Sequence, residues 1–134
     1  PIGGTVSYSY NGLTGSFPSY SYNANKITIS NNNGRIEWSG NQTLIVSSGE
    51  STAISSDDSY TISGTASGTT YQGNDFTAMI DNDLTLLGDC NWVSSGIVTV
   101  SPENKNPRVL DFGSSCDAMA TVRIYSLEYE IEIP

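Results

Sequence analysis

Polar and apolar side chains alternate along short runs of this chain, and that period of two is the feature that most constrains its fold. The period is clearest in TVSYSY (5–10), KITIS (26–30), RIEWS (35–39) and ATVRIY (120–125). Successive side chains of a β-strand point to opposite faces of a sheet, so each run predicts a strand with one apolar and one polar face. Because no stretch of convincing length has a helical period, the sequence predicts an all-β chain.

Turn-forming residues separate these runs. Asn11-Gly12 predicts a hairpin after the first run, and NNNG (31–34) predicts a second hairpin. The same pattern returns in QTLIVS, SYTISG, NDFTAMI, DLTLL, GIVTVS, RVLDF and LEYEIEI. About ten strands with hairpin-length connections favour an antiparallel, meander-rich β-sandwich that forms a single domain over residues 1–134.

The charge of the chain excludes two classes of partner. Fourteen acidic and five basic residues give a formal net charge of −9. Such a surface repels phosphate backbones and anionic lipids, so we expect no nucleic-acid partner. No apolar run approaches the roughly 20 residues of a membrane-spanning helix, so we also expect no transmembrane segment.

Carboxylates are the only catalytic groups that the sequence offers. The chain has no histidine, which removes the commonest general base and the usual serine and cysteine triads. Glu128, Glu130 and Glu132 alternate along the last run, a spacing similar to the catalytic strand of laminarinase-type glycosidases, in which the middle position is Asp. The other face of this run is apolar, which predicts the solvated side of a closing strand. We therefore expect no enzyme and no cofactor.

Two further acidic motifs resemble known functional sites. Asp81, Asp83 and Asp89 lie close together in DNDLTLLGD and are the candidates for a calcium site. The glycine of an EF-hand loop is misplaced there and its final glutamate is absent, which favours turn acids without a metal. DFG at 111–113 lacks the other kinase motifs, so Asp111 is expected to serve a turn.

Cys90 and Cys116 are the only cysteines. A disulfide in an exported protein and a pair of buried free thiols are the two alternatives, and the hydroxyl- and amide-rich composition favours the disulfide.

Aromatic residues suggest a possible ligand. Tyr20, Tyr22 and Trp92, if exposed, would suit stacking on a sugar ring, and SFPSYSYN (16–23) predicts a loop that displays both tyrosines beside Pro18. The alternative is that most of the eight tyrosines are core or cross-strand partners on strand faces.

The carboxy-terminal half resembles a group of uncharacterised secreted or lipid-anchored proteins of Bacteroidetes. The matching residues are Trp38, Ser39 and Gly40; Ile62, Gly64, Ala66, Ser67 and Gly68; Cys90, Trp92, Val93, Ser95, Gly96 and Val98; and Leu110 to Gly113 with Cys116 and Asp117. The likeness continues to the final YEIEI run and spans roughly residues 36 to 133. It implies an exported protein with a bridge between Cys90 and Cys116, and it implies no activity.

These observations lead to an expected function. We expect a non-enzymatic extracellular or cell-surface module, structural or adhesive, whose partners are copies of itself or another surface protein. Alternating strands at both chain ends would allow self-assembly into filaments or arrays through strand addition. A glycan-binding module with carbohydrate as its partner is the alternative.

Overall fold

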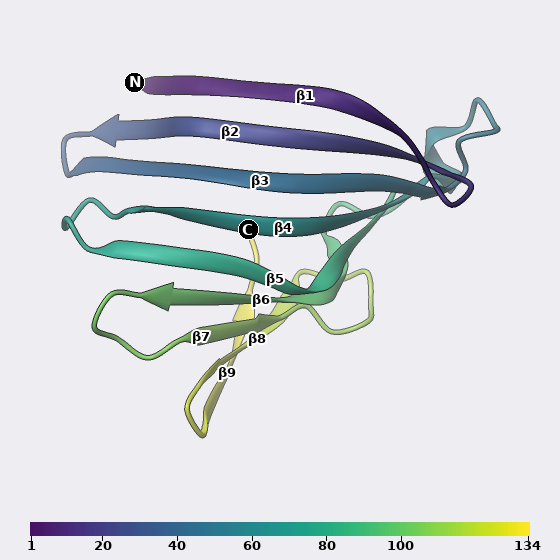
Figure 1. Ribbon diagram of the computed structural model, residues 1–134. Coiled ribbons are helices and arrows are strands. Elements are labelled where there is room, and N and C mark those ends of the chain that lie inside the picture. Colours follow the sequence, from purple (N-terminus) through teal and green to yellow (C-terminus); the bar gives the residue numbers. More distant parts are fainter.

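Nine antiparallel strands form one open sheet in the computed structural model, which describes residues 1–134 (Figure 1). The strands lie side by side in chain order, from β1 at one edge to β9 at the other. Their bounds are β1 Ile2–Thr14, β2 Phe17–Asn31, β3 Gly34–Ser48, β4 Ser59–Thr69, β5 Asp75–Leu87, β6 Val93–Pro102, β7 Arg108–Asp111, β8 Met119–Ile124 and β9 Leu127–Glu132. The predicted all-β chain and its meander are confirmed, and nine strands are close to the expected ten.

The expected β-sandwich is not confirmed, because the chain builds only one layer. Every strand pairs with the strand before it in the sequence, and contacts between strands are essentially those of sheet neighbours. No connection leaves the sheet and crosses over it, as the Greek-key connections of a sandwich do. The only helical segment is η1, a single turn at Ser55–Asp57, and no helix is long and apolar enough to cross a membrane.

The first hairpin turns later than the sequence predicted. Asn11 and Gly12 lie inside β1, and the turn is made by Gly15 and Ser16 between the paired residues Thr14 and Phe17. Gly15 has a φ of 63°, which suits the first central position of a type II′ turn. The Asn-Gly prediction was therefore wrong, since the register shift between Tyr10 and Gly12 marks a bulge there. The second predicted turn, in NNNG, is confirmed at positions 32 and 33.

Bulges also explain why several predicted runs merge into long strands. RIEWS and QTLIVS belong to β3, and NDFTAMI and DLTLL belong to β5. SFPSYSYN, interpreted as a loop, is the start of β2. At the β4 irregularity, Gly64 has a φ of 140°, and a Cβ there would lie 2.1 Å from the carbonyl oxygen of Asn41. Glycine is required at this position, and the strand continues through the irregularity instead of ending.

The sheet is not flat along its whole width. In Figure 1, β1 to β6 run side by side, whereas the shorter β7 to β9 turn away as a curled part, and the fainter carboxyl terminus lies behind β4 and β5. A disulfide joins Cys90, between β5 and β6, to Cys116, between β7 and β8, with a Cα–Cα distance of 5.8 Å. The predicted bridge is confirmed, and it ties the curled part to the loop before β6.

The chain has almost no core of its own. Only six of its 134 residues are buried, namely Pro18, Ser19, Gly40, Val46, Ser94 and Ala120. No side chain is fully buried. A single sheet has two faces and no second layer, so its apolar side chains stay in contact with solvent.

Candidate interaction surfaces

One face of the sheet is apolar from edge to edge. Directly paired residues share a face, so the strand registers define rows of side chains across the sheet. The rows that form this apolar face are Tyr10–Tyr20–Leu44–Ile62–Leu84, Ile27–Trp38–Gly68–Phe76–Pro102, Ala24–Gly40–Ala66–Ala78–Val100, Val46–Tyr60–Leu86–Val93 and Ile80–Val98–Leu110–Val122–Tyr129. Arg108, paired with Val100, is the only charged residue that the register adds to them. The alternation in the sequence predicted this apolar face, but the predicted sandwich would have covered it with a second sheet.

A hollow of about 540 Å³ lies in the middle of the apolar face. Nine of its ten lining residues are hydrophobic, and they come from β1 to β5. Leu44 of β3 is paired directly with Ile62 of β4, and Trp38 of β3 also lines the hollow. Gln42 is its one polar residue. The hollow therefore offers mainly dispersion contacts and apolar burial.

Tyrosines pair at the β1 side of the apolar face. The rings of Tyr8 and Tyr22 are stacked with centroids 5.9 Å apart, and those of Tyr10 and Tyr20 are tilted with centroids 5.3 Å apart. Tyr8 is 71% exposed and Tyr10 is 58% exposed. These two β1 residues were not among the predicted contact residues, although TVSYSY placed them on one face.

The predicted glycan contacts do not form one platform. Tyr20 and Tyr22 lie in β2, whereas Trp92 precedes β6, so β3, β4 and β5 lie between them. At about 4.8 Å per strand, the two groups are separated by roughly 15 to 20 Å. Tyr20 and Tyr22 instead serve as cross-strand partners of the β1 tyrosines, which was the alternative interpretation. Glycan binding stays a prediction.

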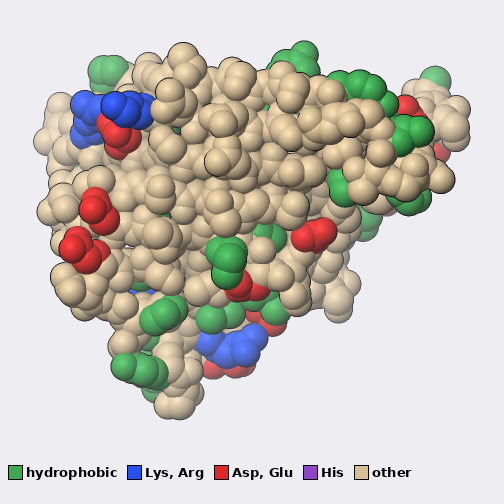
Figure 2. Space-filling view, viewed as in Figure 1, with side chains coloured by type: hydrophobic (Ala, Val, Ile, Leu, Met, Phe, Trp, Pro, Cys, Tyr) green, Lys and Arg blue, Asp and Glu red, His purple; other side chains and the backbone are tan.

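The opposite face carries hydroxyl and amide side chains. Its rows include Ser9–Ser21–Thr43–Ser63, Ser7–Asn23–Asn41–Thr65 and Ser39–Ser67–Thr77–Ser101. Figure 2 shows this polar face as a broad field of uncharged polar atoms over β1 to β5, with few hydrophobic side chains in its middle. Asn23 donates a hydrogen bond to Asn41 across the strands at 2.6 Å. The polar face is suited to solvent, and it satisfies part of its own hydrogen-bonding capacity.

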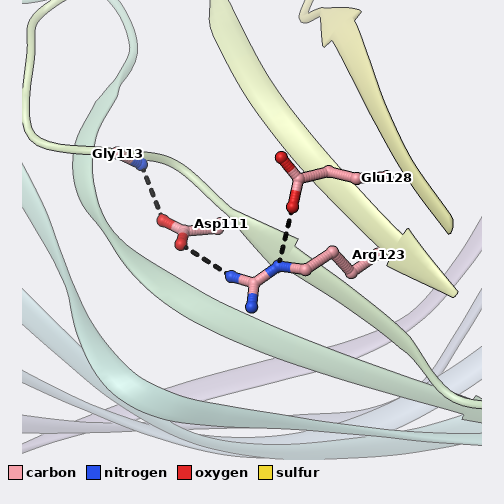
Figure 3. Close-up of polar contacts among 4 residues, drawn as sticks. All are labelled: Asp111, Gly113, Arg123 and Glu128. Carbon is pink, nitrogen blue, oxygen red and sulfur yellow. Dashed lines mark hydrogen bonds and ion pairs between the residues drawn. The ribbon is translucent and has the colours of Figure 1, made fainter. Parts of the chain in front are cut away.

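Charged residues form a short ladder across the last three strands (Figure 3). Arg123 of β8 donates to the Asp111 carboxylate of β7 at 3.1 Å, and its Nε lies 3.6 Å from Glu128 of β9. Asp111 also accepts a hydrogen bond from the Gly113 amide at 2.9 Å, so its predicted role in the turn is confirmed. Exposed ion pairs of this kind contribute about 1 kcal/mol or less each.

The terminal glutamates share one face of β9, as their alternation predicted. Glu128, Glu130 and Glu132 pair with Arg123, Thr121 and Met119 of β8. Every residue of β9 is exposed, so its apolar side chains do not pack on a core as expected. A shallow hollow of about 190 Å³ beside them includes Asp111, Asp117 and Glu130. The two carboxylates of a glycosidase flank a bond of the substrate, whereas these three glutamates follow one another along a single exposed strand.

The calcium candidates are not brought together. No group of three or more acidic, cysteine or histidine side chains lies close enough to hold a metal ion. Asp81 and Asp83 lie in β5, and Asp81 accepts a hydrogen bond from Thr99 of β6. Asp89 lies in the turn before Cys90.

One side chain has a perturbed ionisation. Tyr60 donates a 2.9 Å hydrogen bond from its hydroxyl to Asp58. The pKa of Tyr60 is raised above its ordinary value, chiefly because ionisation would lose this hydrogen bond. Partial desolvation and the charge of the Asp58 carboxylate raise it further. The pair anchors the start of β4.

No protein-family model matches this chain, and neither a curated protein nor a solved structure matches it. The resemblance of the carboxy-terminal half to Bacteroidetes proteins stays a prediction. What the chain does must therefore be inferred from the faces and edges of its own sheet.

Proposed function

We propose that this chain is a non-enzymatic structural and adhesive module, extracellular or at the cell surface, that assembles with copies of itself through strand addition. The observation that carries the proposal is the edge strand β1. It has 13 residues, none of them charged, and it pairs with β2 on one side only. Its outer side therefore offers unpaired N–H and C=O groups to another strand.

The two edges of the sheet differ in protection. Natural sheets guard exposed edges with charged side chains or proline, and β9 carries Glu128, Glu130 and Glu132 in six residues. β1 has no such guard, and it exposes Ile2, Val6 and Leu13. This asymmetry supports β1 as the edge that adds to a neighbour. Two β1 strands related by a two-fold axis normal to the sheet would pair antiparallel and keep both apolar faces on the same side.

The proposed location and the proposed lack of catalysis have separate support. The disulfide between Cys90 and Cys116 favours an oxidising compartment, and the resemblance to secreted or lipid-anchored proteins favours export. The sequence has no histidine, and Glu128 and Asp111 are engaged with Arg123. Together these features favour a binding or structural module over an enzyme.

The test combines electron microscopy with solution mass for the wild type and for Ser7→Lys/Ser9→Lys. Both serines lie in β1 on the polar face, so the lysines charge the edge without touching the apolar face. Pairing of two β1 edges closes at two chains, so fibres or rings need a second self-contact of the sheet as well. We expect the wild type to form assemblies larger than those of the variant. In the variant the sedimentable fraction should fall about tenfold or more, which corresponds to about 1.4 kcal/mol of lost pairing free energy.

The matched control is Thr65→Lys/Ser67→Lys. These two exposed residues have the same spacing and lie on the same polar face, but in the interior strand β4. The control should assemble like the wild type. Equal loss in both variants, or a wild type whose mass does not exceed that of Ser7→Lys/Ser9→Lys, would contradict assembly through β1. A monomer that binds an oligosaccharide through Tyr20 and Tyr22 would favour the glycan-binding alternative instead.

A further inference from the structure

The surface area of the chain is too large for a compact monomer. Its accessible surface is 8515 Å². A folded monomeric protein of 14.3 kDa is expected to expose about 6,800 Å², so this chain exposes about 1,700 Å² more. The excess has an evident source, because the apolar face that would form a core in a two-layer protein is uncovered.

The size of that excess matches what a pair of chains would bury. If two copies each buried about 1,700 Å², the interface would total about 3,400 Å², within the range of about 2,000 to 5,000 Å² typical of obligate homodimers. Half that area per chain would already suffice for a standard specific interface. Exposed apolar patches larger than a few hundred Å² mark interaction sites on soluble proteins.

The distribution of charge favours a second copy as the occupant. Two chains of net charge −9 repel each other, so they can associate closely only through a surface that carries little charge. The apolar rows contain one charged residue, Arg108, whereas Glu37, Asp75, Asp111 and the β9 glutamates lie on the polar face. Stacking the apolar faces therefore keeps most of the strand charges outward and turns both hydroxyl- and amide-rich faces to solvent.

We propose that two copies stack their apolar faces to form an antiparallel β-sandwich, with one sheet contributed by each chain. Sheets that pack this way lie about 10 Å apart with interdigitated side chains, and a two-fold axis makes the contact self-complementary. The second layer predicted from the sequence is then supplied by the partner chain. This inference deepens the proposed self-association but uses a face rather than the β1 edge, so each can fail without the other.

The first test is the solution mass of the full chain by analytical ultracentrifugation, for the wild type and for Ser7→Lys/Ser9→Lys. The edge-charged variant should have twice the 14.3 kDa mass of one chain, even where larger assemblies are lost. Leu44→Asp/Ile62→Asp places two directly paired carboxylates in the apolar face and should weaken dimerisation about a hundredfold or more. A folded monomer for the edge-charged variant at all accessible concentrations would overturn the sandwich.

The matched control is Thr43→Asp/Ser63→Asp. These residues are also directly paired between β3 and β4, one position from Leu44 and Ile62, but they lie on the polar face. The control bears the same charge and the same cross-strand repulsion, so it should dimerise like the wild type. Equal weakening by both double variants would overturn the assignment of the interface to the apolar face.

The second test remains decisive if Leu44→Asp/Ile62→Asp does not fold. Trp92→Phe leaves Trp38 as the only tryptophan, and Trp38 lines the hollow of the apolar face. Acrylamide quenching of Trp38 should increase severalfold on dilution, in step with the fall in mass from dimer to monomer. A dimer in which Trp38 stays as accessible as in the monomer would place the interface elsewhere and overturn the proposal.

Discussion

Tyr60 shows at the residue scale how a single polar contact fixes the start of a strand. Its side chain belongs to the apolar face, paired with Val46 and Leu86, while its hydroxyl reaches Asp58 in the preceding loop. An amphipathic side chain suits this position, because its ring packs on apolar neighbours and its hydroxyl is satisfied by a carboxylate. The contact also makes stability depend on pH.

Because the folded-state pKa of Tyr60 is raised, the folded state favours the neutral phenol. The stabilisation is fully present below the unfolded pKa of about 10 and is lost as pH rises through the higher folded pKa. Denaturant unfolding between about pH 8 and pH 11 should therefore show a steeper loss of stability for the wild type than for Tyr60→Phe. Asp58→Asn should reduce the difference, since it removes the carboxylate charge. Parallel pH profiles for the wild type and Tyr60→Phe would refute this role.

At the scale of elements, the long strands β1 to β6 and the short strands β7 to β9 are held together differently. The first six have 10 to 15 residues each, whereas β7 has four residues and β8 and β9 have six each. Short ladders contribute few hydrogen bonds and little side-chain contact. The disulfide joins the loop after β5 to the loop after β7, so it ties this weaker part to the rest of the sheet.

Cys90→Ser/Cys116→Ser should lower the free energy of unfolding by about 3.5 kcal/mol, the chain-entropy value for a separation of 26 residues. Amide hydrogen exchange should increase most in β6 to β9 and least in β2 to β4. Reduction of the wild type with a thiol should reproduce the effect, because both treatments open the same covalent loop. A loss below about 1 kcal/mol, or uniform acceleration across the sheet, would mean that the bridge does not hold the curled part.

At the scale of the whole molecule, charge and hydrophobicity act in opposite directions. Each chain carries a net charge of −9, which opposes association, while the apolar face favours it. The chain has five basic and fourteen acidic residues, so few basic side chains can form ion pairs with a second copy. Two of the five, Arg35 and Arg123, already pair within the chain. Association of two copies should therefore depend on salt in a definite direction.

Adding sodium chloride should strengthen the dimer. The Debye length falls from about 30 Å at 0.01 M to about 8 Å at 0.15 M, so the repulsion between two acidic chains is screened. We expect the dissociation constant from sedimentation equilibrium to fall severalfold over this range. Association held by ion pairs between chains would weaken with salt instead, and that result would contradict an apolar interface.

Several features were predictable because they are local. The period of two identified the strands and sorted their side chains by face, as RIEWS and LEYEIEI illustrate. The turn role of Asp111 was predictable from its position before Gly113. The Asn-Gly prediction failed because a glycine with positive φ suits a bulge as well as a turn, and the pairing partner decides between them.

The sequence alone determined the chemistry of the two faces, because alternation places each side chain without reference to distant residues. Only the tertiary structure decided how those faces are used. Consecutive pairing from β1 to β9 puts all the apolar sides on one face of one sheet and leaves Trp38, Leu44 and Ile62 without a second layer. Strand order depends on hydrogen bonds between distant segments, and the period of two is the same for a strand in one open sheet and for a strand in a sandwich.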